Sequence, residues 1–283
     1  MSDQQTETTR ANAVVDALGL LYHDELDPDE FMLFPEDGAI TVQTDAEVSD
    51  WHQTYGGRDG FECLVRTILS QNTNDAASQP AHEALLERYG RGSDSTDDLA
   101  ESLARAPHAE LADTIQSAGL YNQKATNIID AAEWVLSEFG STAAFDTFVT
   151  DGDPKEVRET LLDVTGVGPK TADCVLLFSG GKPGVFPVDT HVHRIARRLG
   201  IAPPDADHEA VREHLERDVP GEKCGFGHTA MIQFGRDYCR AQQPACLDDP
   251  EACPLVDICD QVGVNTATGS VVDPSEEPHD YSS

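Results

Sequence analysis

Apolar residues recur at helical spacing along much of this 283-residue chain, and this periodicity limits the folds that the chain can adopt. Phe61, Leu64, Val65, Ile68 and Leu69 fall at i, i+3, i+4, i+7 and i+8, the pattern of one buried helix face. Alternation with a period of two, which would indicate half-buried strands, is nearly absent. The sequence therefore predicts an all-α fold, and it contains no repeat of solenoid period.

Glycine, proline and polar capping residues divide the rest of the chain into helix-length segments. Hydrophobic residues make up 39% of the chain, which is enough to bury a sizeable core. Besides the helix that starts at Phe61, we predict helices at residues 80–89, 97–104, 107–117, 122–139, 155–163, 170–179, 189–199, 207–218 and 223–238.

The charge of the chain is strongly unbalanced, with 52 acidic residues against 19 basic residues and a formal net charge of −33. Such a charge disfavours non-specific attraction to nucleic acid or to anionic membranes. The acidic residues are spread along the chain, as in proteins of halophilic archaea, whose surfaces stay soluble in concentrated salt, where the Debye length is about 3 Å. The alternative is an ordinary acidic interaction protein.

The sequence shows neither a membrane-spanning segment nor the apolar core of a signal peptide. No segment approaches the roughly 18 apolar residues that a membrane span needs, and the first ten residues lack the core of a signal peptide. We therefore expect a cytoplasmic protein with no membrane partner. Residues 23–50 contain ten acidic and no basic residues, which predicts a solvated segment.

Residues 154–178 combine two amphipathic helix patterns with a Gly-Val-Gly-Pro turn between them. Gly166 and Gly168 predict a tight turn that no bulky residue could make, and Pro169 suits the first position of the second helix. Backbone N–H groups at such a helix start point outward and bind phosphate without reading a base. The turn therefore indicates either a DNA phosphate site or a plain corner between two helices.

Residues 165–200 are the one clearly basic stretch of the chain. Its two acidic residues, Asp173 and Asp189, are outnumbered by five basic residues: Lys170, Lys182, Arg194, Arg197 and Arg198. A solvated helix face would also explain the arginines. Their proximity to the phosphate-ready turn favours a DNA contact, and we predict that Arg194, Arg197 and Arg198 bind DNA.

The turn belongs to a longer segment, VTGVGPKTADCVL, which a Gly- and Pro-rich loop separates from VDTHVHRIARRLG. Together these segments resemble the helix-hairpin-helix and the catalytic aspartate of the endonuclease III family of DNA glycosylases. The segments ILSQNTND and GLYNQKATNII resemble that family's two DNA-probing loops, so the likeness covers about residues 60–260. Thr165 departs from the family, which commonly has Pro at that position.

The resemblance implies a two-lobed helix-hairpin-helix glycosylase fold with an iron–sulfur cluster loop. We expect an acidic N-terminal region at residues 1–59, part of which packs on the cluster lobe, and a helical barrel lobe at 60–180. Residues 181–264 would form the lobe that carries the catalytic aspartate and the cluster. Residues 265–283 would form a disordered tail.

Lys170 is the residue that the resemblance identifies as the nucleophile. Its amine must be neutral to attack C1′ of the flipped nucleotide, and a helix N-terminus and partial burial favour the neutral form. Attack expels the base and leaves a Schiff base, from which β-elimination cuts the strand. The alternative for Lys170 is a surface lysine that binds phosphate.

Asp189 is the predicted catalytic carboxylate, which would stabilise positive charge developing on the sugar. Its position before THVHRIARRL is also that of a helix N-cap, and both roles are compatible.

Chemistry on a base requires that the base leave the helical stack and that another group fill the gap. By resemblance, Leu120 is the wedge and Asn72 is the polar residue that fills the gap. The alternative for Leu120 is a hydrophobic residue that caps a helix.

Four cysteines, Cys239, Cys246, Cys253 and Cys259, follow the pattern C-x6-C-x6-C-x5-C. The resembling family has two residues rather than six between the second and third Cys. Four thiolates in this short segment still fit a [4Fe-4S] cluster, with zinc as the alternative. Cys63, Cys174 and Cys224 are predicted to be buried thiols.

Together these features predict a bifunctional DNA glycosylase and abasic-site lyase of base excision repair. The resemblance implies removal of oxidised pyrimidines from damaged double-stranded DNA by a monomer. Two alternatives remain open: an adenine or mismatch-thymine glycosylase of the same fold, or a non-catalytic helix-hairpin-helix protein that binds DNA.

Overall fold

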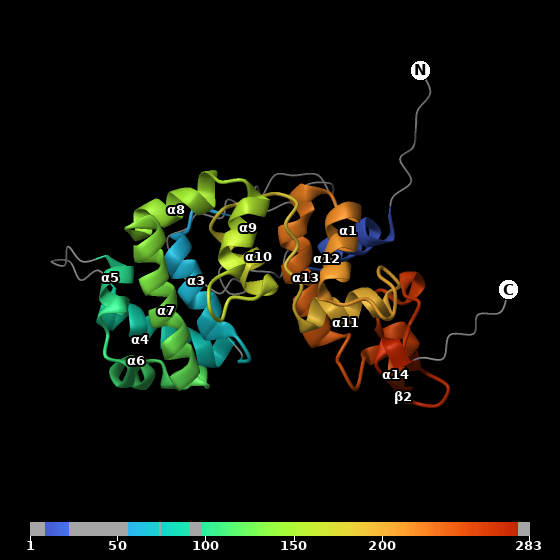
Figure 1. Ribbon diagram of the computed structural model, residues 1–283. Coiled ribbons are helices and arrows are strands. Elements are labelled where there is room, and N and C mark those ends of the chain that lie inside the picture. The colour runs from blue at the N-terminus through green and yellow to red at the C-terminus, as the bar shows by residue number, and fades with distance from the viewer. Residues whose placement is uncertain (1–8, 23–55, 74, 91–97, 277–283) are drawn as a thin grey trace, which may run out of the picture. The chain divides into compact units, whose positions relative to one another are not determined.

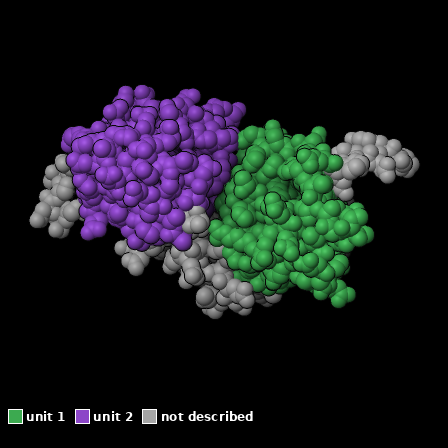
Figure 2. Space-filling view, turned by 90° about the horizontal axis from the view of Figure 1, so that it is seen from below, with its two compact units in different colours: residues 1–26, 42–53, 183–283 green, residues 27–41, 54–182 purple. Residues whose placement is uncertain are grey.

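A computed structural model describes residues 9–22, 56–73, 75–90 and 98–276 of the chain. These residues form helices joined by turns and one two-stranded hairpin, which confirms the predicted all-α fold (Figure 1). They divide into two compact units, one with residues 9–22 and 183–276 (unit 1) and one with 56–73, 75–90 and 98–182 (unit 2; Figure 2). The acidic segment 23–50 lies outside the described residues.

Unit 2 is built around α3 (Gly60–Ser70), which packs against α4, α7, α8 and α10. All five apolar residues of the predicted helix face are buried in the core, from Phe61 to Leu69. The other helices are α4 (Asp75–Tyr89), α5 (Leu99–Ala104), α6 (His108–Thr114), η1 (Gln116–Ala118), α7 (Tyr121–Phe139), α8 (Thr142–Asp151), α9 (Pro154–Leu162) and α10 (Pro169–Phe178).

One helix of unit 2, α8, is absent from the sequence-based prediction. It begins where the Ser141 side chain accepts a hydrogen bond from the Ala144 N–H at 3.2 Å, and it follows Gly140, whose left-handed backbone ends α7. Its buried residues are Thr142, Phe145 and Val149. Two of these three are β-branched, which weakens the helical signal of this segment, and packing on α3 compensates for it.

Unit 1 is centred on α13 (Cys224–Asp237), which packs against α1 (Arg10–Tyr22) and α11 (Thr190–Arg198). The helix α1 was not predicted, although Ala11, Val14, Val15, Leu18 and Tyr22 are spaced as one helix face and are all buried. The remaining elements are α12 (His208–Asp218), η2 (Gly221–Lys223), α14 (Ala245–Asp248), η3 (Pro250–Ala252), η4 (Val256–Ile258), β1 (Val264–Asn265), β2 (Ser270–Val271) and η5 (Pro274–Glu276).

Within the region predicted as a disordered tail, the described residues 265–276 contain secondary structure. Strands β1 and β2 pair antiparallel, with Val264 opposite Val271, and η5 follows. Residues 265–276 are ordered because the Asp273 carboxylate accepts hydrogen bonds from both terminal nitrogens of the Arg197 guanidinium at 2.9 and 3.0 Å. The composition of this segment does not predict its structure, because the residue that stabilises it, Arg197, lies far from it in the sequence.

None of the described helices is long and apolar enough to cross a membrane.

Candidate active site and cysteine pocket

The helix-hairpin-helix of unit 2 consists of α9, the turn at residues 163–168 and α10. An ion pair joins its two helices, since Arg158 Nε donates to Oδ1 of the buried Asp173 at 2.7 Å. Val164 and Val167 anchor the turn in the core. The turn is therefore held from both sides, and its remaining residues are available to face outward.

Gly166 and Gly168 need glycine for different reasons. Gly166 has a φ of 82°, and a Cβ atom there would lie 2.3 Å from Nδ2 of Asn127, so the turn requires glycine as predicted. Gly168 has a φ of −101°, and a Cβ there would meet no atom within 4 Å. The prediction that the turn itself requires Gly168 is wrong, and space at this position is open to an approaching ligand.

Lys170 is the second residue of α10 and is half-buried. Pro169 occupies the first turn as predicted, and no side chain caps this N-terminus. The backbone N–H groups of the first turn and the helix dipole place positive potential at this end of α10. That potential attracts anions such as a phosphate group.

Leu120 lies at the N-cap position of α7 with its backbone in the left-handed region, at a φ of 47°. Its side chain is 62% exposed, so it does not pack as a capping hydrophobe. A left-handed backbone and an exposed apolar side chain both cost free energy, and the mostly exposed Leu120 side chain gains little from packing in the described part of the chain to offset that cost. Such a residue is a candidate for insertion into a partner.

Asn72 follows the end of α3, is exposed, and also has a left-handed backbone with a φ of 53°. Asparagine tolerates this conformation better than most residues. Unit 2 thus contains five of the predicted site residues: Asn72, Leu120, Gly166, Gly168 and Lys170.

Asp189 belongs to unit 1, where it is the N-cap of α11 as the sequence predicts. Its Oδ1 accepts a hydrogen bond from the Val192 N–H at 2.8 Å, and its side chain is partly exposed. This bond fixes the orientation of the carboxylate.

Arg197 and Arg198 do not have the role predicted from their charge. They are 6% and 3% exposed. Arg197 pairs with Asp273, and Arg198 donates to the carbonyl oxygens of Arg240, at 2.7 Å, and Ala241. Guanidinium groups buried in this way cannot reach a DNA phosphate, so the assignment of these two residues as DNA-binding is corrected.

Arg194 and Lys182 also bind the protein's own backbone. Arg194 is half-buried, and its Nε and Nη2 donate to the Cys239 carbonyl at 3.1 and 2.9 Å. The Lys182 ammonium donates to the carbonyls of Thr150 and Gly152. The basic stretch seen in the sequence therefore serves mainly to stabilise loops.

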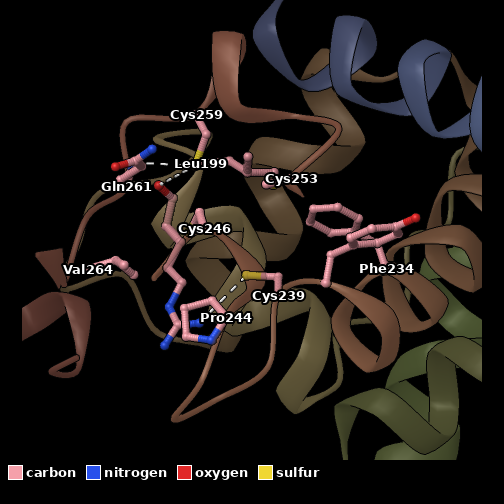
Figure 3. A pocket seen from close by; sticks show the side chains of 11 residues that line it. Leu199, Phe234, Cys239, Pro244, Cys246, Cys253, Cys259, Gln261 and Val264 are labelled. Carbon is pink, nitrogen blue, oxygen red and sulfur yellow. Dashed lines mark hydrogen bonds between the residues drawn. The ribbon is translucent and has the colours of Figure 1, made fainter. Parts of the chain in front are cut away.

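Cys239, Cys246, Cys253 and Cys259 line one pocket of unit 1, as Figure 3 shows. Leu199, Phe234, Tyr238, Pro244 and Val264 complete an apolar wall. Burial raises the pKa of the Cys246, Cys253 and Cys259 thiols, that of Cys259 to about 12. Cys63, Cys174 and Cys224 are buried elsewhere, as predicted.

Two donors face the sulfur atoms of this pocket. The backbone N–H of Gln261 donates to Cys259 Sγ at 3.3 Å, and Arg198 Nη1 lies 3.6 Å from Cys239 Sγ (Figure 3). Within the described residues, no three His, Cys, Asp or Glu side chains are arranged to hold a metal ion. Four thiols around one pocket are a donor set that suits either a [4Fe-4S] cluster or a zinc ion.

Sequence reasoning missed a buried lysine next to the Leu120 loop. Lys124 is 3% exposed, and its Nζ donates to the carbonyl oxygens of Leu69, at 2.7 Å, and Ala118, at 2.8 Å. Burial lowers the pKa of Lys124 to about 8. The sequence could have indicated this residue, because Lys124 lies on the otherwise apolar face of the helix pattern at residues 122–139.

Residues 65–220 match the family described as HhH-GPD superfamily base excision DNA repair protein. Endonuclease III of Thermotoga maritima is 34% identical over 71% of this chain and 83% of the relative. Endonuclease III of Bacillus subtilis is 33% identical over 70% of this chain and 80% of the relative.

A solved structure of a trapped endonuclease III–DNA covalent intermediate matches with a TM-score of 0.62 and 27% identity. The match covers 87% of this chain and 92% of that structure's chain. The chain therefore belongs to the endonuclease III family of DNA glycosylases and abasic-site lyases, within the HhH-GPD superfamily of base excision DNA repair proteins.

Proposed function

We propose that this protein is a bifunctional glycosylase and lyase that removes oxidised pyrimidines from duplex DNA through Lys170. The observation that carries the proposal is the position of Lys170, directly after the glycine turn at the uncapped N-terminus of α10. A phosphate bound at that helix start would bring the damaged nucleotide within reach of the amine. The solved endonuclease III–DNA covalent intermediate that this chain resembles supports a covalent route.

The chemistry follows from an amine acting on the sugar. The neutral Lys170 nitrogen forms a bond to C1′ while the bond from C1′ to the base breaks, and the base leaves with that electron pair and a proton. Opening of the sugar ring gives an imine between Lys170 and C1′. Loss of a proton from C2′ then breaks the bond between C3′ and its oxygen, which cuts the strand, and water releases the lysine.

Asp189 would stabilise the positive charge that develops on the sugar as the base departs. The N-cap bond to Val192 supports this role, because it holds the carboxylate in one orientation before the substrate arrives. A mobile carboxylate would have to be ordered during the reaction.

Leu120 would insert into the DNA stack as the base leaves it, and Asn72 would face the gap that remains. The exposed side chain and left-handed backbone of Leu120 support the wedge role. The open space at Gly168 supports a phosphate contact at the turn, because a side chain there would block the backbone N–H groups. Arg194 stays a predicted DNA contact.

Cys239, Cys246, Cys253 and Cys259 would hold a [4Fe-4S] cluster, since their side chains line one apolar pocket with N–H donors toward sulfur. When bound, the cluster would cross-link four positions of the loop that also receives Arg194 and Arg198. Its contribution to the reaction would be structural, through the position of α11 and Asp189.

Borohydride trapping tests the proposal. Duplexes that carry thymine glycol, uracil, mismatched thymine, 8-oxoguanine opposite adenine or an abasic site are incubated with the protein and borohydride. We expect a covalent adduct with thymine glycol and with abasic DNA, because only an imine is reduced to a stable bond. Lys170→Gln should abolish the adduct and retain DNA binding.

Lys182→Gln provides the matched control, because Lys182 lies in the same basic stretch but bonds to the backbone. Its adduct yield should equal that of the wild type. A Lys170→Gln protein that still cuts abasic DNA at the wild-type rate would overturn the mechanism. Excision of adenine or mismatched thymine in preference to thymine glycol would overturn the substrate class.

A further inference from the structure

We propose that Lys124 is a positioning residue that sets the spacing between the Asn72 loop and the Leu120 loop, so that both enter the DNA together. The inference rests on the proposed function, in which Leu120 is the wedge and Asn72 faces the gap. The observation that supports the inference is the pair of hydrogen bonds that the Lys124 ammonium donates inside unit 2.

The Lys124 side chain joins the two segments that precede these loops. One Nζ bond, of 2.7 Å, goes to Leu69 O, three residues before Asn72. The other, of 2.8 Å, goes to Ala118 O, two residues before Leu120. The two loops lie about fifty residues apart in the chain, and this single buried group contacts the backbone of both.

The electrostatics of the two carbonyls explain why a lysine occupies this buried position. Leu69 lies in the last turn of α3, and Ala118 is the last residue of η1, so both carbonyl oxygens belong to helix C-termini. Such carbonyls lack a partner within their helix and carry partial negative charge. A cation there satisfies two acceptors at once, whereas an apolar side chain would leave both unpaired.

Further contacts connect the Asn72 loop and α7 to the glycine turn at residues 163–168. Gln71 Nε2 donates to Gly166 O at 2.9 Å and to Thr171 Oγ1 at 3.1 Å. Gln123 Nε2 donates to Oδ1 of Asn127, the residue packed against Gly166. These hydrogen bonds thereby connect the Asn72 loop to the turn and place the helix that follows Leu120 against the turn.

The spacing matters because an extruded base leaves one gap of fixed size. A wedge and a gap-filling residue that move independently would insert at the same time only rarely, and ordering them during the reaction would be costly. Lys124 fixes both strained loops before DNA arrives. Loss of this bridge should therefore impair base extrusion more than the chemistry at a site that has no base.

The test compares two substrates under single-turnover conditions. One duplex carries the base that the wild type excises from the panel above, and the other carries a preformed abasic site. For Lys124→Met we expect base excision to fall by more than about tenfold. We expect borohydride trapping on the abasic duplex to fall by less than about threefold, because no base has to be extruded.

Lys182→Met is the matched control, because the Lys182 ammonium also bonds to two carbonyls at a helix C-terminus, those of Thr150 and Gly152 at the end of α8, but among the described residues has no hydrogen bond to either loop. Both of its activities should stay within about twofold of the wild type. If Lys124→Met does not fold, Lys124→Arg replaces it, since arginine keeps the donors and changes their reach.

A double-mutant cycle with Leu120→Ala separates positioning from general stability. If Lys124 acts through Leu120, then Lys124→Met costs little further excision once Leu120 is alanine, and the two effects are not additive. Equal losses on both substrates, or additive effects with Leu120→Ala, would overturn the inference. Absence of any adduct with the wild type would instead refute the proposed function.

Discussion

At the scale of single residues, burial decides what each basic side chain does. Arg197 and Arg198 look alike in the sequence and lie in its basic stretch, yet both are buried and bound to protein acceptors. Lys170 occupies a helix N-terminus, and Lys124 joins two helix C-termini. Arg197, Arg198 and Lys124 therefore bind acceptors within the protein, whereas Lys170 is the residue that we propose acts in the chemistry.

Arg197→Gln tests the structural role of Arg197. We expect the free energy of unfolding to fall by about 2 kcal/mol, because a buried charged hydrogen-bond network is lost. Arg105→Gln is the control, since Arg105 forms an exposed pair with Glu101, and its loss should be at most about 0.5 kcal/mol. Urea denaturation measures both changes. Reduced DNA affinity of Arg197→Gln without any loss of stability would restore its role as a DNA contact.

The same pair predicts a pH dependence. Hydrogen bonds from Arg197 hold the pKa of Asp273 well below its usual value. The stabilisation is therefore present above the pKa of an unfolded aspartate, about 3.9, and is lost as the pH falls below it. The difference in unfolding free energy between wild type and Asp273→Asn should be largest near neutral pH and should shrink below about pH 4. A difference that grows on acidification would contradict this assignment.

At the scale of elements, short segments after α13 depend on partners far along the chain. The segment from Cys239 to Cys259 contains only short helical turns, and its four cysteines share a pocket with α11 and α13 residues. Six residues between Cys246 and Cys253 form the end of α14 and η3, with Asp249 capping η3. The longer spacer is thus accommodated as an exposed turn outside the pocket.

Metal analysis of the purified protein tests the cysteine pocket. We expect about four iron atoms per chain and broad visible absorbance, as for a [4Fe-4S] cluster. Cys253→Ala should remove most of the iron and lower the unfolding temperature. Cys174→Ala is the control, because this buried thiol lies in unit 2, outside the pocket, and its iron content should be unchanged. Stoichiometric zinc without iron in anaerobically prepared protein would refute the cluster.

At the scale of the whole molecule, a net charge of −33 opposes a polyanionic substrate. Arg197 and Arg198 are buried, so they add no phosphate contacts that could offset this repulsion. Salt weakens a conventional protein–DNA complex with a slope of about −0.9 per neutralised phosphate, but it also screens repulsion between like charges. With few phosphate contacts, the second effect should dominate.

We therefore expect lesion excision to be retained or increased between low and molar KCl. The measurement is the single-turnover excision rate across a KCl series, with circular dichroism at each concentration to separate folding from binding. Leu120→Ala should reduce excision most in high salt, where the proposed insertion of Leu120 would carry more of the binding. A steep, continuous fall in the wild-type rate from low salt upward would contradict both this prediction and the halophilic interpretation.

The sequence by itself determined the features that depend on neighbours within a few residues. The helical period of Phe61 to Leu69, the N-cap at Asp189 and the turn at Gly166 are local signals, and the structure contains each of them. The order of these motifs was also enough to identify the family.

Tertiary structure alone decided which partner each polar group meets. Arg197 and Asp273 lie 76 positions apart, and Lys124 and Leu69 lie 55 apart, so no local pattern relates them. The helix α8 likewise forms because its apolar residues pack on α3. The segment after Cys259 is held by the pair between Arg197 and Asp273. Hydrophobic period and capping act over one or two helical turns, whereas burial and charge pairing are properties of the assembled fold.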